Sequence, residues 1–369
     1  MIERGRISSL QMAIMMYPTI LATAILLVPA ITAKHAKQDM WLSPVWASLI
    51  GFLTVYIAYR LHKLYPKESI VEYSELILGR IFGKIIGLVY ILFFLHVNGI
   101  VIREYGEFVV GTFLHHTPMF AVAGILVLVC AFAVRGGVEV IARSAEICVP
   151  IVFFLLLLLL ILVIPDLDPK NMFPIFEYGM MPSFMGSAVP QSWFSEFILI
   201  AFLLPYLTDK AKGKKWGMLS VSAVMLTMVM TNIHALFLFG EITASLTYPI
   251  MLASRYISLA DFLEHLESIV MAIWVTGTFI KISVFYYAIV LGTSQWLKLS
   301  DYRPIVFPIG FLLVIISFWV APNLQELTHF LGTSGVFYFL SVQTGIPMLL
   351  LIIAGIRKKI HPNKEELKT

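Results

Sequence analysis

Long apolar runs separated by short polar segments follow one another along nearly the whole chain. A helix needs about 20 largely apolar residues to cross roughly 30 Å of hydrocarbon. Ten runs of this kind, bounded by charges or by Pro and Gly, are residues 10–33, 41–61, 84–113, 118–134, 144–164, 187–206, 217–240, 268–297, 304–321 and 334–356. The segments between them are too short for a soluble domain. The pattern therefore predicts an all-α integral membrane protein in which residues 1–369 form a single transmembrane domain.

Two of the polar connections carry helical patterns of their own. Residues 67–83 and 250–267 place apolar side chains at helical spacing opposite acidic ones, which predicts interfacial helices. Gly79, Gly83 and Gly87 recur every fourth residue, a spacing that lets another backbone approach one helix face closely. We expect packing roles for all of these segments.

The composition agrees with a lipid environment. Of the 369 residues, 59% are hydrophobic and only 13% are charged, whereas soluble domains carry about 25% charged residues. Cys130 and Cys148 lie inside apolar runs, so they exclude a disulfide scaffold and offer no metal-ligand spacing. The basic residues form no single patch, and we expect no nucleic-acid partner.

The distribution of basic residues predicts the orientation. If the N-terminus is inside, the inside segments carry 20 of the 26 Lys and Arg residues and the outside segments carry 4. The remaining two, Arg103 and Lys281, lie within spans. This positive-inside bias favours ten transmembrane helices with both termini in the cytoplasm.

Ionisable residues near the bilayer centre cost several kcal/mol unless they are paired or face a cavity, so each is a functional candidate. Glu196 lies near the middle of the sixth run and Lys281 near the middle of the eighth. Lys281 either serves as a fixed cation or titrating amine near a site, or only neutralises Glu196. Arg103, Glu104 and Glu107 lie toward the outside of the third run, where Arg103 and Glu107, one turn apart, form a structural pair or take a ligand role.

Prolines flank small or polar residues in the first and sixth runs. Pro18 and Pro29 enclose the Ala22–Thr23–Ala24 segment, and Pro190 and Pro205 enclose Ser195 and Glu196. These runs begin two five-span halves, about residues 8–164 and 185–356, that cross the membrane in opposite directions. The layout is typical of an inverted-repeat transporter with broken helices 1 and 6, whose helix ends bind a small polar solute. The alternative is a proline kink in each helix without a ligand.

Several segments together resemble the B subunits of bacterial spore germinant receptors, a branch of the amino acid/polyamine/organocation transporter superfamily. They are PTILATAILLVP, YPKESIVEYSELILGRIFGKIIG, RGGVEVIARSAE, SEFILIAFLLPYL and FIKISVFYYA. The resemblance covers almost the whole chain. The first run departs from it, because Ala22, Thr23 and Ala24 stand where superfamily transporters commonly show glycines.

The resemblance implies a LeuT-type 5+5 core in the inner membrane of an endospore. The chain would act with a membrane-bound A subunit and a lipoprotein C subunit, and would recognise a nutrient germinant, typically an amino acid. The implied substrate-binding residues are Ala22, Thr23, Ala24, Asn98, Phe194, Ser195, Glu196, Thr278 and Lys281. Lys281 lies on the helix that, with span one, forms a sodium site in some relatives, so a built-in cation there would remove the need for sodium.

We therefore expect a sensor of a small-molecule germinant that needs no cofactor and no metal. The alternative is a proton-coupled amino acid transporter in which Lys281 or Glu196 carries the proton. An enzyme has little support, because the sequence shows no nucleophile–base pair, metal cluster or phosphate-binding glycine loop. A channel for ions or water is a further class, since polar side chains could line a continuous path.

Overall fold

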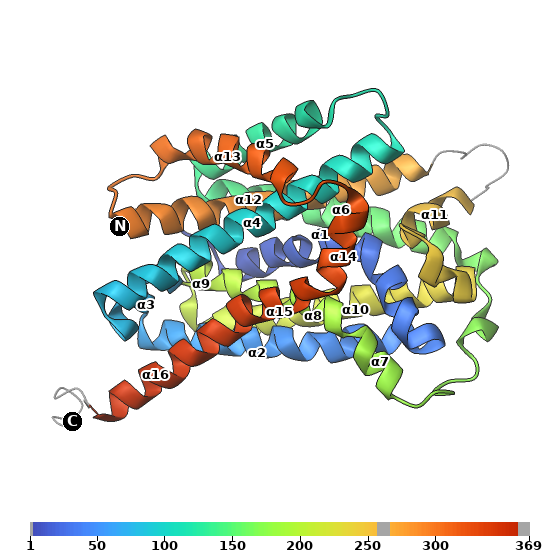
Figure 1. The fold of residues 1–369 in the computed structure, drawn as a ribbon, viewed down its shortest axis with the longest axis horizontal. Coiled ribbons are helices and arrows are strands. Elements are labelled where there is room, and N and C mark those ends of the chain that lie inside the picture. Colours follow the sequence, from blue (N-terminus) through green and yellow to red (C-terminus); the bar gives the residue numbers. More distant parts are fainter. Residues whose placement is uncertain (1–2, 257–265, 361–369) are drawn as a thin grey trace.

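The computed structural model describes residues 3–256 and 266–360, and these ranges are helical apart from short connections and one isolated β-bridge between Ile7 and Leu207. Long helices run side by side along the length of the molecule (Figure 1). They are α1 (Ser9–Ala36), α2 (Ser43–Leu64), α4 (Arg80–Thr112), α5 (Met119–Gly136), α6 (Val138–Leu162), α10 (Gly213–Phe239), α12 (Glu267–Leu297), α13 (Val306–Trp319) and α16 (Ile346–Ile360).

Shorter helices connect or complete these long ones. They are α3 (Ile70–Leu78), α7 (Met181–Gly186), α8 (Ala188–Ser195), α9 (Ile200–Leu203), α11 (Pro249–Tyr256), α14 (Leu324–Gly332) and α15 (Ser334–Leu340). Every predicted apolar run coincides with one of these helices or with a consecutive set of them, which confirms the all-α class.

Within the described residues, eight helical segments are long and apolar enough to cross a membrane, or nine if the bent pair Arg303–Trp319 and Leu324–Gly332 is one span. The first segment, Ser9–Leu64, contains both α1 and α2. Figure 1 places the start of the chain and the end of α16 at the same end of the bundle. The count of ten and the cytoplasmic position of both termini stay predictions.

Helix α1 is continuous, so the expected break in the first span was wrong. Both Pro18 and Pro29 lie inside an unbroken α-helix. Proline interrupts a helix mainly by removing hydrogen bonds, and in a membrane neighbouring side chains can satisfy the freed carbonyls. The carbonyls that lose a donor to Pro18 and Pro29 are those of Ile14 and Ile25, four residues earlier. On either side of Ile14, the hydroxyl of Ser220 on α10 donates to the carbonyl of Ala13 at 2.9 Å, and that of Thr19 donates to the carbonyl of Met15 at 2.7 Å, which stabilises this turn of α1.

The sixth span is interrupted where the sequence predicted a break. Helix α8 ends at Ser195, the 3₁₀ segment η4 (Glu196–Leu199) follows, and α9 and a second 3₁₀ turn, η5 (Leu204–Tyr206), complete the span. A 3₁₀ stretch within a longer helix often marks a hinge or a functional site. The interruption changes the helical pitch at Glu196 without opening the chain.

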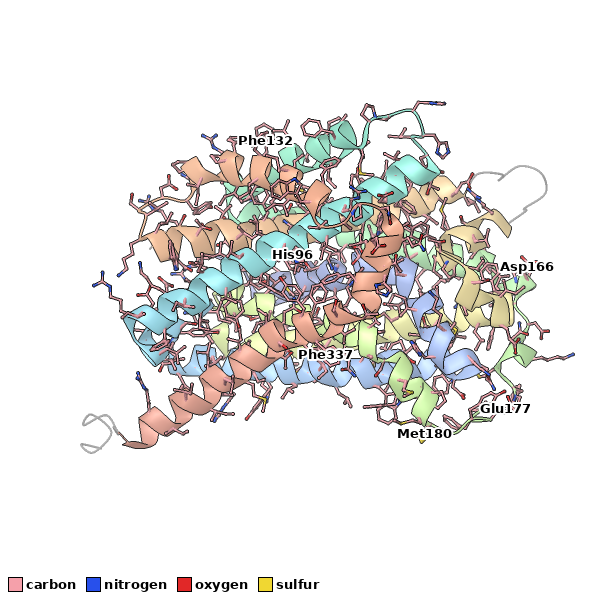
Figure 2. The ribbon with its side chains drawn as sticks, viewed as in Figure 1. His96, Phe132, Asp166, Glu177, Met180 and Phe337 are labelled. Carbon is pink, nitrogen blue, oxygen red and sulfur yellow. The ribbon has the colours of Figure 1, made fainter. Side chains whose placement is uncertain are left out.

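The interrupted span lies at the centre of the molecule. In an apolar stretch of 18 residues within this span, 89% is buried inside the protein, whereas the corresponding share for the segment Val138–Asp166 is 28%. Phe132 of α5 and Phe337 of α15 lie on the outer surface of the bundle (Figure 2), 62% and 76% exposed. Large exposed apolar side chains of this kind suit contact with lipid, whereas the central spans contact protein.

The first predicted interfacial helix, residues 67–83, is helical as α3 over Ile70–Leu78, after a capping box between Ser69 and Glu72, and its interfacial position stays a prediction. Gly79, at φ 85°, makes the turn into α4, a conformation that glycine adopts without a steric penalty. Gly83 lies against the backbone of Ser74 and Glu75, which confirms a close backbone approach at this position alone. Gly79 lies between the two helices and Gly87 faces the side chains of Val71 and Trp296, so the expected shared face of three glycines was wrong. Helix α11 covers the start of the second predicted interfacial helix, and residues 257–265 lie outside the described residues.

The segment before α1 fastens the start of the chain to the end of the sixth span. Ile7 donates to the carbonyl of Tyr206 at 3.2 Å and accepts from the backbone N–H of Thr208 at 2.9 Å. The backbone N–H and the hydroxyl of Ser9 both donate to Oδ1 of Asp209 at 2.7 Å. The first helices of the two predicted halves are therefore joined at this end.

Candidate functional site

A buried ion pair joins the two charges that the sequence singled out. Nζ of Lys281, in the middle of α12, donates to Oε2 of Glu196 at 2.7 Å. The two side chains are 0% and 6% exposed. The ammonium also lies 5.6 Å from the centre of the Phe285 ring, one turn along the same helix, close enough for a cation–π contact. Lys281 thus neutralises Glu196, which is one of the two roles that the sequence left open for it. The pair also faces a cavity, so the other role stays open.

That cavity lies between α1, α4, α8, η4 and α12 and is closed by α14 and α15. Its volume of about 20 Å³ is enough for one water-sized group. Its lining consists of Thr23, Val97, Ile100, Val101, Glu104, Val189, Ser192, Trp193, Glu196, Lys281, Leu331 and Phe339. The walls are mostly apolar and a few polar groups converge on the space, which is the composition of a small-molecule site.

A third ionisable side chain, Glu104 of α4, lines the same cavity and is 5% exposed. It interacts electrostatically with both Lys281 and Glu196. The cavity therefore brings together two carboxyl groups and one ammonium group. The sequence places Glu104 toward the outside of its span and assigns it no particular role. Val101 and Ile100, three and four residues earlier, share its helix face, but the sequence holds no signal for the direction in which that face points.

Hydrogen bonds hold the helices around the cavity together. The indole N–H of Trp193 on α8 donates to the hydroxyl of Thr23 on α1 at 2.9 Å. The hydroxyl of Ser195 donates to the side-chain oxygen of Gln343, in the π-helical segment η9 (Ser341–Gly345) between α15 and α16. The hydroxyl of Ser192, which lines the cavity, has no hydrogen-bond partner among the described residues.

Three of the residues predicted to bind substrate line the cavity together: Thr23, Glu196 and Lys281. Ser195 is adjacent but turns toward Gln343. The other predicted residues are buried around the site without lining it. We therefore keep their binding roles as predictions.

The neighbours of those other residues are defined. Ala22 faces Gly277 of α12, and Phe194 packs against Gly51 of α2. Ala24 is fully buried. The amide of Asn98 donates to the carbonyl of Ile282 at 3.4 Å, and the hydroxyl of Thr278 is buried without a partner in the described part of the chain.

Arg103 and Glu107 form the structural pair that the sequence allowed. Their side chains approach to 2.7 Å, and Arg103 also donates to the carbonyl of Pro322 at 3.0 Å. These bonds satisfy the guanidinium away from the cavity.

A larger hollow of about 630 Å³ lies beyond the cavity, between the C-terminal part of α1 and α14. Lys34, His35 and His329 are among its lining residues, and we call it the vestibule. Val189 lines both the vestibule and the buried cavity. Leu331 of α14 lines the cavity, while its neighbours Gly332 and Thr333 line the vestibule. A thin apolar wall therefore separates the two spaces.

The fold defines the class of protein. A solved Na⁺-coupled sialic acid symporter, in a substrate-bound outward-open state, superposes with a TM-score of 0.64 at 13% sequence identity, over 94% of this chain and 79% of that chain. The protein is thus a multi-pass membrane protein with a LeuT-like transporter fold.

The sequence comparisons define the family. A family model described as "Spore germination protein" matches residues 6–324. Spore germination protein KB of Bacillus subtilis (strain 168) is 30% identical over 364 residues, which cover 97% of this chain and 96% of the relative. Spore germination protein YndE of the same organism is 28% identical over 362 residues, 96% and 98% of the two chains. The chain belongs to the spore germination protein family and is a permease-like member of it.

Proposed function

We propose that this chain is the nutrient-recognition subunit of a spore germination receptor in the inner membrane of the spore. A germinant, typically an amino acid, binds at the cavity lined by Thr23, Glu196 and Lys281 and shifts the conformational population of the chain. A membrane-bound A subunit and a lipoprotein C subunit read that change. The chain performs no catalysis.

The observation that supports this proposal is the buried Lys281–Glu196 pair beside a cavity, in a protein of the spore germination family. Removing two charges from water costs several kcal/mol, so a pair of this kind is weak evidence for stability. A binding role explains why the pair is present, because charged groups of a ligand can pair with Lys281 and Glu196 in place of the bond between them. The interrupted helix at Glu196 supplies a hinge by which binding reaches the rest of the span.

The second candidate function is proton-coupled amino acid transport, and Glu104 favours it specifically. A second buried carboxyl group beside the pair can take up and release a proton during a transport cycle. Both functions use the same cavity, and they differ in whether net solute flux occurs.

The test is binding and uptake of radiolabelled amino acids and sugars by the purified chain in liposomes, with and without a proton gradient. A sensor is expected to bind a solute without accumulating it. Accumulation driven by the gradient would establish the transporter instead.

The variants Lys281→Ala and Glu196→Ala are expected to lose solute binding, and Glu241→Ala, at an exposed carboxyl outside the cavity, is the matched control. Wild-type binding by both cavity variants would remove the site assignment. Binding is also expected to be independent of sodium, because the ammonium of Lys281 supplies a fixed cation.

A further inference from the structure

The balance of charges in the cavity leads to one inference beyond the proposed function. This inference rests on that function. The Lys281–Glu196 pair is internally neutral. Glu104 then remains as a buried acid for which the described residues provide no hydrogen bond or ion pair of its own. A buried carboxylate without a cation costs several kcal/mol. The cavity is therefore one positive charge short of neutrality whenever Glu104 is ionised.

The groups around Glu104 do not supply that charge. On its own helix, Arg103 is paired with Glu107 at 2.7 Å. From the other elements, Lys281 of α12 is paired with Glu196 of η4, and Tyr248, which precedes α11, is a neutral phenol that interacts with Glu104 and Glu107. The missing cation must come from outside the described chain, either as a proton or as part of a ligand.

The size and lining of the cavity indicate which cation fits. The volume of about 20 Å³ matches one water-sized group, and an ammonium head group is of that size. Its N–H donors need oxygen acceptors. The carboxylate of Glu104 and the unpartnered hydroxyl of Ser192 provide two, and the hydroxyl of Thr23, which accepts one bond from Trp193, retains a second lone pair.

We propose that Glu104 is the counter-ion for the ammonium group of the ligand, and that a proton occupies Glu104 in the ligand-free protein. On binding, the Glu104 O–H bond breaks, its proton leaves to solvent, and the carboxylate pairs with the incoming ammonium. Counting the ammonium group of the ligand alone, the charge of the cavity is zero before and after binding. Ligands of this site are amines or zwitterions, and their binding releases one proton.

The probe for this proposal is methylammonium chloride, titrated against the purified chain in detergent at constant ionic strength, with the thermal unfolding midpoint as the readout. A ligand that binds only the folded state raises this midpoint in a saturable manner. Methylammonium is expected to do so, whereas neutral acetamide is not. The apparent Kd is expected to rise up to about tenfold for each unit of pH decrease while the proton occupies Glu104.

Glu104→Gln, which keeps the shape of the side chain and removes its charge, is expected to weaken methylammonium binding at least about tenfold and to remove its pH dependence. Glu241→Gln, at an exposed carboxyl outside the cavity, is the matched control and is expected to bind as the wild type does. Ser192→Ala, which leaves the charges unchanged, is expected to weaken binding and serves if Glu104→Gln fails to fold.

Wild-type affinity and pH dependence in Glu104→Gln would overturn the proposal. The proposal would also be overturned if sodium chloride stabilised the wild type as strongly as methylammonium does and failed to stabilise Glu104→Gln. The site would then take a metal cation. Neither result would affect solute recognition at Lys281 and Glu196, which the liposome experiment tests separately.

Discussion

At the scale of single residues, the Lys281–Glu196 pair is the costliest feature of the core. Both side chains are almost completely buried, and each carries a charge. Truncating one partner leaves the other as an uncompensated ion, which typically costs about 3–5 kcal/mol, whereas replacing both with apolar residues is often neutral or stabilising. Stability and function can therefore be separated by substitution.

We predict that Lys281→Met and Glu196→Leu each destabilise the protein by about 3 kcal/mol or more, and that the double variant recovers most of this loss. Thermal unfolding of the three purified variants measures the effect. The double variant is nevertheless expected to bind no solute, because the charges that contact the ligand are gone. A double variant that binds solute like the wild type would assign the pair to packing alone.

At the scale of elements, the start of α1 depends on Asp209, which accepts two bonds from Ser9, the first residue of that helix. Burial raises the pKa of Asp209, but the hydrogen bonds from Ser9, with help from Lys212, outweigh it and hold this pKa below the usual range. A depressed carboxyl pKa means that the ionised form stabilises the folded state. This stabilisation is complete above the unfolded pKa of about 4 and is lost as the pH falls through the lower folded value.

We predict that Asp209→Asn lowers the free energy of unfolding by about 1 kcal/mol at neutral pH, since Asp209 is only partly buried. The difference from the wild type is expected to stay constant from about pH 8 to pH 5 and to vanish only at more acidic pH. Thermal midpoints across this range measure it. Asp166→Asn, at an exposed carboxyl shortly after α6 (Figure 2), is the control, and an equal effect there would contradict the specific role of Asp209.

Most elements could be predicted because their signals are local. A run of about 20 apolar residues is readable from the sequence, and the charges at 196 and 281 are conspicuous within such runs. The continuity of α1 could not be predicted, because it depends on packing against helices distant in the sequence, such as α10, whose Ser220 bonds the carbonyl of Ala13 more than 180 residues away. The direction in which the Glu104 side chain points could not be predicted either, because the rotation of α4 about its axis is fixed by packing against other helices.

At the scale of the whole molecule, the structure is closed around its site. The cavity holds one water-sized group, so an amino acid needs a larger space than this conformation provides. The vestibule offers that space but is separated from the cavity by Val189 and Leu331. Leu331 lies on α14, a short helix bent by 90° from α13. A small movement of α14 would join the two spaces without disturbing the long helices, and entry by this route makes Leu331 the gate.

We predict that Leu331→Ala opens the cavity to solvent. The readout is the rate at which a small methanethiosulfonate modifies a cysteine introduced by Val97→Cys, on the cavity wall, with Cys130 and Cys148 replaced. Because modification requires exposure, an opening favoured by about 1.4 kcal/mol gives about a tenfold faster reaction. Leu327→Ala makes the same truncation on the same helix at a buried position that does not line the cavity, and is expected to leave the rate unchanged. Equal acceleration by both variants would mean that loosening of α14 as a whole, and not the side chain of Leu331, controls entry, whereas acceleration by Leu331→Ala alone places the gate at that residue.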